Sequence, residues 1–200
     1  MLLDATQSQL VLVDYQPRLM PAIFEGPLVL ANALRLAQIA QLLEVPVWGT
    51  EQNPSRLGEN APELRALSAR TLSKMHFSGV EEGLAEWLRP PVKPLAGNAR
   101  SLPKHLQKPT ETNAERNTIV IAGCEAHVCL LQTALHLLED EFEVWVVTDA
   151  CSSRTERNRD AAFDRLAGAG AELVTTEMVA FEWLRSAEHP NFKAVQNLIK

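Results

Sequence analysis

The sequence predicts an α/β protein in which helices cover both faces of a mainly parallel, doubly wound sheet. Short apolar runs of strand length alternate with longer helical stretches, and this rhythm is typical of repeated βα units. The runs are apolar at nearly every position, as expected for strands buried on both faces. Because such units cross over with one hand, the expected architecture is three-layered, α-β-α, with a Rossmann-like topology.

The first half of the chain supplies three strands and a helix. Residues 9–14 form an apolar run that closes on a carboxylate, Asp14. Residues 27–44 predict a helix that is apolar except for a narrow stripe, in which a polar side chain recurs every third residue. Residues 45–50 and 70–74 predict the next two strands. A strand, a helix and a strand in succession imply parallel pairing.

The second half repeats this order. Strands are expected at residues 117–122, 143–148 and 171–175, with helices from about 127 to 139 and from about 156 to 167 between them. These units extend the same sheet, so the second half is expected to belong to the same domain as the first.

The chain has 200 residues, the usual size of one compact domain, so we expect a single domain over residues 1–200. Five of its twelve prolines fall between residues 90 and 109, in a stretch with few apolar residues. This composition predicts a surface insertion near residues 90–116 rather than a second domain.

Composition excludes several classes of function. The chain carries 25 acidic and 19 basic side chains, a net charge of −6, which disfavours binding to nucleic-acid phosphates. The longest stretch without a charged residue, 126–138, is too short to span a bilayer. Three cysteines without a C-x-x-C pair fit a reducing compartment, so we expect a cytoplasmic protein. No glycine-rich phosphate motif follows any strand, and no cofactor is expected.

Three residues at predicted strand ends could carry chemistry: Asp14, Lys74 and Cys129. Ligands of open α/β sheets bind outside the carboxyl ends of the strands, where these side chains are expected to meet. Cys129 falls in the first turn of a predicted helix, whose dipole favours a thiolate. Taken singly, each has a structural explanation: a small core residue, a turn residue and a solvated lysine. Together they match the nucleophile, base and electrostatic partner of a covalent hydrolase.

A resemblance to a known family adds to this interpretation. The sequence resembles the isochorismatase-like cysteine hydrolase superfamily over nearly its whole length, and within it the isochorismatase domain-containing subgroup. The segments that carry the resemblance are LVLVDYQ (10–16), TEQNP (50–54), LSKMHFS (72–78), AGCEAHVCLLQTAL (122–135), DACSSR (149–154) and HPNFKAVQNLIK (189–200). The proline-rich insertion departs from that subgroup.

Carried over to these residues, the resemblance implies Cys129 as the nucleophile, Asp14 as the base that takes its proton, and Lys74 as the cation that orients both. It also implies a non-proline cis peptide between Cys124 and Glu125. The backbone N–H groups of Glu125 and Cys129 would then form an oxyanion hole for a tetrahedral intermediate.

The loop after the second strand distinguishes this chain from the metal-binding members of the superfamily. Nicotinamidases bind a metal there through an Asp and histidines, whereas this sequence has Thr-Glu-Gln-Asn at 50–53. Glu51 alone is a poor transition-metal site, so no metal is expected. Gln16, Gln52 and His127 are candidate polar groups for binding a small substrate, with surface exposure as the alternative for the two glutamines.

The leading hypothesis is therefore a metal-independent cysteine hydrolase, with a covalent acyl-enzyme, that cleaves a small amide, carbamoyl or related planar acyl substrate. One alternative is a non-catalytic interaction protein that retains the fold. Another is a thiol redox sensor based on a low pKa at Cys129, with Cys124 as the resolving thiol. A homo-oligomer, dimeric or larger, is expected under each hypothesis, with the helix at 27–44 and the segment 189–200 as its contacts.

Overall fold

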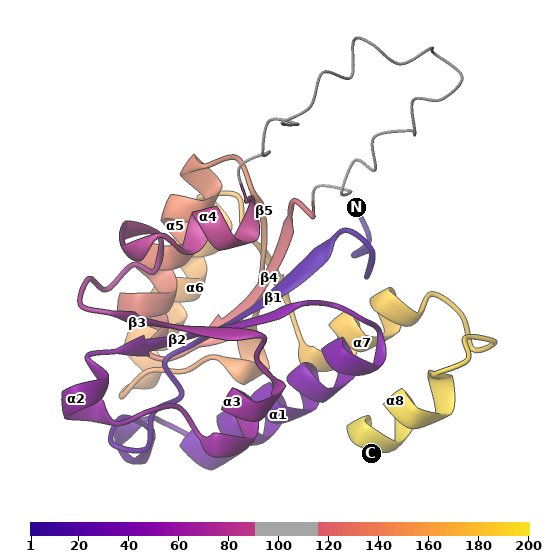
Figure 1. Ribbon diagram of the computed structural model, residues 1–200, viewed down its shortest axis with the longest axis horizontal. Coiled ribbons are helices and arrows are strands. Elements are labelled where there is room, and N and C mark those ends of the chain that lie inside the picture. Colours follow the sequence, from indigo (N-terminus) through magenta and orange to yellow (C-terminus); the bar gives the residue numbers. More distant parts are fainter. Residues whose placement is uncertain (91–115) are drawn as a thin grey trace, which may run out of the picture.

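The computed structural model describes residues 1–90 and 116–200 and contains a sheet in the order β3-β2-β1-β4-β5-β6 (Figure 1). Every neighbouring pair of these strands is parallel. The strands are β1 (Ser8–Val13), β2 (Val47–Gln52), β3 (Arg70–Lys74), β4 (Thr118–Gly123), β5 (Glu143–Val147) and β6 (Glu172–Val174). The predicted fold class is confirmed.

Helices cover both faces of the sheet, as Figure 1 shows. One layer holds α1 (Gly26–Leu42), α3 (Pro62–Leu67) and α7 (Thr176–Leu184), with α8 (Phe192–Ile199) packed on α1 and α7. The other holds α4 (Leu84–Leu88), α5 (Leu131–Glu139) and α6 (Glu156–Gly168). The shorter elements are α2 (Pro54–Leu57), the 3₁₀ turns η1 (Met20–Ala22), η2 (Val80–Glu82) and η6 (Thr148–Ala150), and a π-helix, η5 (Ala126–Leu130). Among the described helices, none has the length and apolar character needed to cross a membrane.

The centre of the sheet is the most deeply buried part of the molecule. Every residue of β1 and β4 is buried, which explains why both sequences are apolar at almost every position. The chain adds β2 and β3 on one side of β1, then returns to add β4, β5 and β6 on the other side. The order therefore switches between β1 and β4, and the crevice at such a switch point is where doubly wound sheets bind ligands.

The structure differs from the sequence-based expectation in its helices. The helix predicted from residue 127 begins instead as the π-helix η5 and becomes α-helical at Leu131. The helices that were not predicted are α2, α3, α4, α7 and α8. The predicted insertion at 90–116 falls almost wholly on residues 91–115, outside the described residues.

The C-terminal segment packs on its own chain. The Asn191 side-chain amide donates to the Leu42 carbonyl at the end of α1 (2.7 Å), and the rings of Phe181 and Phe192 lie 6.4 Å apart. Part of the surface expected to serve contacts between subunits is therefore occupied within the chain.

Candidate active site

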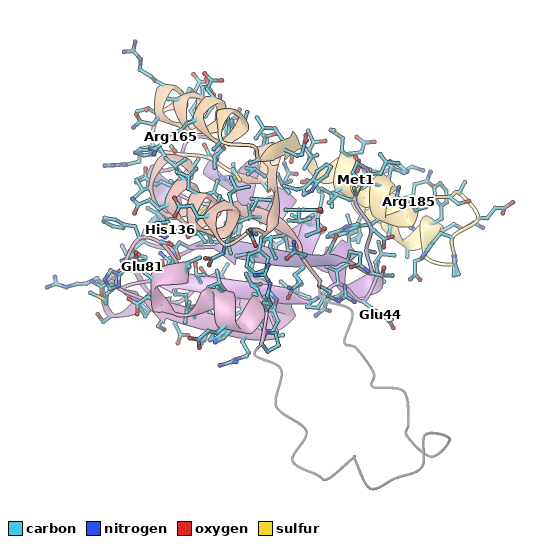
Figure 2. The ribbon with its side chains drawn as sticks, turned by 90° about the horizontal axis from the view of Figure 1, so that it is seen from above. Met1, Glu44, Glu81, His136, Arg165 and Arg185 are labelled. Atoms are coloured by element: carbon cyan, nitrogen blue, oxygen red, sulfur yellow. The ribbon has the colours of Figure 1, made fainter. Side chains whose placement is uncertain are left out.

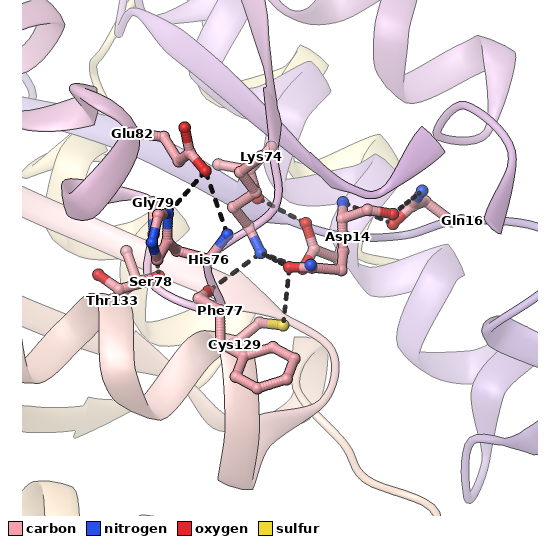
Figure 3. A network of polar contacts seen from close by, with 12 residues as sticks. Asp14, Gln16, Lys74, His76, Phe77, Ser78, Gly79, Glu82, Cys129 and Thr133 are labelled. Atoms are coloured by element: carbon pink, nitrogen blue, oxygen red, sulfur yellow. Dashed lines mark hydrogen bonds and ion pairs between the residues drawn. The ribbon is translucent and has the colours of Figure 1, made fainter. Parts of the chain in front are cut away.

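Four neighbouring strands deliver the candidate residues to one edge of the sheet. Asp14 directly follows β1, Cys129 follows β4 within η5, and Gln52 and Lys74 are paired in register at the ends of β2 and β3. Because parallel strands end at the same edge, residues distant in sequence meet there, as Figure 3 shows for Asp14, Lys74 and Cys129. The structure thus brings together the three residues singled out from the sequence.

The Lys74 ammonium is buried, and three acceptors surround it. Its Nζ donates to Asp14 Oδ2 (2.8 Å), to Gln52 Oε1 (2.7 Å) and to the backbone carbonyl of Phe77 (3.0 Å). The other carboxylate oxygen of Asp14 accepts a hydrogen bond from the Thr50 hydroxyl (2.7 Å). Removing two charges from water is unfavourable unless both are paired and hydrogen-bonded, and here both are. This pairing fixes the positions of the carboxylate and the ammonium.

Cys129 lies on a distorted turn rather than on a regular helix. The Glu125 carbonyl accepts hydrogen bonds from the N–H groups of Val128 (3.1 Å) and Leu130 (3.3 Å), and the second of these defines the wide π turn. Short π-helical turns within helices occur often at functional sites. The Cys129 thiol lies 3.9 Å from Gln52 Oε1, and this same oxygen accepts a hydrogen bond from Lys74 Nζ.

A close approach of backbones supports this turn. A Cβ atom on Gly123 would lie 2.4 Å from the carbonyl oxygen of Val13 and 2.5 Å from its Cβ, so glycine is required where β4 ends against β1. The peptide bond between Cys124 and Glu125 is cis, as the family resemblance implied.

The protonation of Cys129 corrects the expectation drawn from its helix position. The sequence predicted a thiol made acidic by the helix dipole. In the structure, burial is the main cause that raises the pKa of the Cys129 thiol to about 12, and the negative charge of Asp14 raises it further. Lys74 lowers it, but by less. The thiol is therefore protonated at neutral pH, and forming the thiolate requires a base.

The two glutamines have different places in the site. Gln52 contacts both Lys74 and Cys129 and has the position expected of a site residue. Gln16 is fully buried, and its amide bonds the backbone: Nε2 donates to the carbonyls of Gln52 and Gly58, and Oε1 accepts from the N–H of Gln52 (2.9 Å). These contacts occupy both ends of the amide and hold the loop that carries Gln52, and a substrate role for Gln16 stays a prediction.

His127 and Glu125 lie beside this cluster and are tied to the loop that precedes α6 and to the first turn of α6. The Nδ1 of His127 pairs with the Ser153 hydroxyl (2.9 Å) and its Nε2 with the Asn158 amide (3.3 Å). The Glu125 carboxylate accepts hydrogen bonds from the backbone N–H and the guanidinium Nε of Arg154 (3.1 and 2.9 Å). A substrate role for His127 stays a prediction, and binding there would have to compete with these contacts.

Glu51 is the acidic residue of the segment 50–53, where the metal-binding members of the superfamily have their ligands. In this structure its contacts are structural. Its carboxylate accepts a hydrogen bond from the Asn60 N–H (2.8 Å) and pairs with Arg65 Nε (3.3 Å). It is almost fully buried, so these partners satisfy it without a metal.

Three contributors to the site were missed in the sequence: the Thr50 hydroxyl, the Phe77 carbonyl and the carboxylate of Glu82. Thr50 closes the predicted strand 45–50 as Asp14 closes the predicted strand 9–14, and this matching position could have indicated that the two lie side by side; in the structure, Thr50 pairs with Val13. A backbone carbonyl leaves no residue-type signal, so Phe77 could not have been found in this way. Glu82 accepts hydrogen bonds from the backbone N–H groups of Met75 and His76, in the loop that also carries Phe77.

Together, the fold and the site define a doubly wound α/β protein that buries a carboxylate–ammonium pair beside a thiol at the switch point of its sheet. Comparisons with known proteins agree with this class. An Isochorismatase domain matches residues 100–178. Mouse isochorismatase domain-containing protein 2A is 36% identical over 193 residues, covering 96% of this chain and 82% of the mouse protein.

Solved structures extend the comparison. The structure described as MAR1 ribonuclease from Caenorhabditis elegans superimposes with a TM-score of 0.83 at 31% identity, covering 100% of this chain and 92% of that one. The Escherichia coli YcaC gene product, described as an octameric hydrolase of unknown specificity, gives a TM-score of 0.74 at 24% identity, with 100% and 95% covered. The chain belongs to the isochorismatase-like hydrolase family.

Proposed function

We propose that this protein is a cysteine hydrolase that cleaves a small amide, carbamoyl or related planar acyl compound, with Cys129 as nucleophile, Asp14 as base and Lys74 as their electrostatic partner. One observation carries the proposal: a fully buried Lys74 ammonium joins the Asp14 carboxylate to Gln52, whose oxygen also contacts the Cys129 thiol. A buried nucleophile, a base and a fixed cation in one cluster are the parts that covalent acyl transfer requires.

The protonated state of Cys129 determines the first step. Because its pKa is raised to about 12, the thiol must lose its proton as it attacks, and the Asp14 carboxylate is the nearby base. As Asp14 takes the proton, Sγ forms a bond to the carbonyl carbon and the carbonyl π electrons move to oxygen. The N–H groups of Glu125 and Cys129 are proposed to stabilise this oxyanion, and one such donor is worth about 3–4 kcal/mol.

The remaining steps reuse the same proton carrier. Asp14 returns its proton to the departing nitrogen, the carbon–nitrogen bond breaks, and a thioester remains on Cys129. Asp14 then takes a proton from water, and the resulting hydroxide attacks the thioester carbon. Collapse of that intermediate breaks the carbon–sulfur bond and releases the carboxylic or carbamic acid, and Asp14 returns its proton to the departing sulfur, which restores the thiol and the carboxylate. Each turnover consumes one water, and neither an oxidant nor a reductant is required.

The test is to trap the acyl-enzyme. The protein is incubated with a panel of small amides, carbamoyl compounds and activated esters, quenched in acid and measured by intact-protein mass spectrometry. We expect a substrate-dependent mass increase that disappears in Cys129→Ala, a variant that keeps Cys124 and Cys151. An adduct that persists in this variant, or turnover without Cys129, would overturn the proposal.

The sensor alternative has less support than hydrolysis. Thiols that react readily with oxidants are exposed and acidic, whereas Cys129 is only 6% exposed and has a raised pKa. The suggested resolving residue, Cys124, is fully buried, and burial raises its pKa to about 12 as well. A non-catalytic interaction protein, in turn, would have no use for a buried ion pair beside a thiol.

The name of the C. elegans structure raises a second candidate, ribonuclease activity, which we consider less well supported. RNA binding depends on cations that neutralise phosphates, yet this chain has a net charge of −6. Lys74 cannot supply that charge, because it is buried and bound to Asp14. We expect no cleavage of a fluorescent single-stranded RNA at low salt. Cleavage that is lost in Cys129→Ala would instead favour the ribonuclease.

We also propose that the protein is a homo-oligomer. The family relative from E. coli is described as octameric, and large apolar side chains remain exposed here on α1 and α7: Leu28 (52%), Met178 (46%) and Phe181 (43%). Light scattering on the purified protein at micromolar concentration should give a mass that is a multiple of 22.1 kDa. A single-chain mass would contradict this prediction.

A further inference from the structure

The loop that follows Lys74, residues 75–79, supplies one of the three acceptors of its ammonium. We call it the lysine loop. The acceptor is the Phe77 carbonyl, 3.0 Å from Lys74 Nζ. A backbone carbonyl is only as well placed as the loop that carries it, and Met75 and Phe77 themselves are exposed by 65% and 51%. Apolar packing of these two side chains therefore does little to hold the loop in place.

The Glu82 carboxylate holds one side of the lysine loop. From η2, its Oε1 accepts hydrogen bonds from the backbone N–H groups of Met75 (2.9 Å) and His76 (3.1 Å), and it pairs with His76 Nδ1 (2.9 Å). Figure 3 shows the side chain reaching back toward the loop. These hydrogen bonds lower the pKa of Glu82 to about 2, and the one from the Met75 N–H has the largest effect. The carboxylate is thus ionised throughout the range in which enzymes are assayed.

The other side of the lysine loop is tied to the helix that continues from Cys129. The buried Thr133 hydroxyl accepts a hydrogen bond from the Gly79 N–H (3.0 Å), and the Ser78 hydroxyl pairs with His136 Nδ1 (3.0 Å). Figure 2 shows His136 beside Glu81, and the distance from His136 Nδ1 to Glu81 Oε1 is 4.0 Å. The loop therefore links the strand that carries the lysine to the helix that carries the thiol.

We propose that Glu82 is a positioning residue: by holding the lysine loop, its carboxylate fixes the Phe77 carbonyl and thereby the Lys74 ammonium. This inference rests on the proposed function of Lys74. A buried ammonium must keep its protons bonded, so displacement of the Phe77 carbonyl would draw Nζ away from its place between Asp14 and Gln52. Lys74 would then stabilise a Cys129 thiolate less well.

Three variants test the proposal. Glu82→Ala removes the acceptor, Glu82→Gln keeps an uncharged Oε1 that can still accept from both backbone N–H groups, and Glu86→Ala removes an exposed carboxylate on α4 as a control. We expect Glu82→Ala to lower kcat/KM about tenfold, mainly through kcat, since misplacement of a catalytic group costs up to ~10²-fold. Glu82→Gln should restore most of this activity, and Glu86→Ala should match the wild type.

A second readout needs no substrate. Because Lys74 lowers the pKa of Cys129, a displaced ammonium should shift alkylation of Cys129 by iodoacetamide to higher pH in Glu82→Ala and not in Glu82→Gln. Equal effects of Glu82→Ala and Glu82→Gln would show that the negative charge of Glu82 matters and not its hydrogen bonds to the lysine loop. That outcome would overturn the inference, and so would a Glu82→Ala variant that matches the wild type in both assays. If turnover survives in Cys129→Ala, the proposed function fails instead, while alkylation still reports on the loop.

Discussion

At the scale of the residue, the Asp14 carboxylate has two opposing effects on Cys129. Its negative charge raises the pKa of the thiol and so disfavours the free thiolate. In the proposed mechanism, the same carboxylate accepts the thiol proton and makes attack possible. A nucleophile kept protonated until substrate arrives is protected from side reactions, because the thiolate is the reactive species.

Replacement of Asp14 by Asn should separate these two effects. The neutral amide cannot take a proton, so turnover should fall by ~10²–10⁴-fold, the usual contribution of a general base. The pKa of Cys129 should nevertheless decrease, because one cause that raises it is gone while Lys74 remains. Alkylation of the variant should therefore proceed at lower pH than in the wild type, with Cys129→Ala as the blank for Cys124 and Cys151. Alkylation shifted to higher pH would contradict this account.

At the scale of the element, the parallel pairing of β4 with β1 depends on the absence of a side chain at Gly123. Gly123→Ala would place a methyl group 2.4 Å from the Val13 carbonyl oxygen, with backbone as the obstacle. The free energy of unfolding should fall by about 3 kcal/mol, the upper part of the usual range for overpacking. Activity should fall as well, since Cys129 lies six residues after Gly123 in the chain.

Gly168→Ala provides the matched control, because a methyl group there meets nothing within 4 Å. Gly168 ends α6, where alanine is a better helix former, so stability should be unchanged or higher by up to ~1 kcal/mol. Urea denaturation of both variants measures the difference. Equal stabilities of the two variants would mean that the paired ends of β1 and β4 tolerate the methyl group.

The central strands could be predicted from sequence because their apolar runs report burial directly, whereas the edge strand β3 is mostly polar and only Lys74 in it is buried. The predicted run at 70–74 coincides with β3, and those at 9–14 and 117–122 differ from β1 and β4 by a residue at each end. Helix α7 was missed because its sequence is apolar on most of its surface and carries little 3.6-residue pattern. The π-helix at Cys129 was missed because it depends on the Glu125 carbonyl, which accepts hydrogen bonds from two N–H groups. No residue type in the sequence predicts that arrangement.

In the candidate site, too, some features could be predicted from the sequence and others could not. Asp14, Lys74 and Cys129 were found because strand ends place side chains at a known edge of the sheet. What sequence could not supply was the environment of each group. The dipole argument predicted an acidic thiol at Cys129, but burial is the larger cause and has the opposite sign. The sequence also could not show that backbone atoms occupy both ends of the Gln16 amide.

At the scale of the whole molecule, all three thiols are buried and share one direction of pKa shift. Burial raises the pKa of Cys124 and Cys129 to about 12 and that of Cys151 well above its usual value. The Tyr15 hydroxyl, also buried, is shifted upward too. In the unfolded chain these groups regain their ordinary values, so the folded and unfolded states differ in bound protons at alkaline pH.

This difference predicts a steep loss of stability above pH 9. Below that pH the thiols are protonated in both states and contribute no difference. Between about 9 and 12 the unfolded chain releases protons that the folded chain retains, which favours unfolding by up to ~1.4 kcal/mol per pH unit for each thiol. Urea denaturation at pH 8, 9 and 10 should show this slope, and Cys129→Ala should reduce it by one thiol's share. A free energy of unfolding that stays level from pH 8 to 10 would contradict the raised pKa values of the three buried thiols.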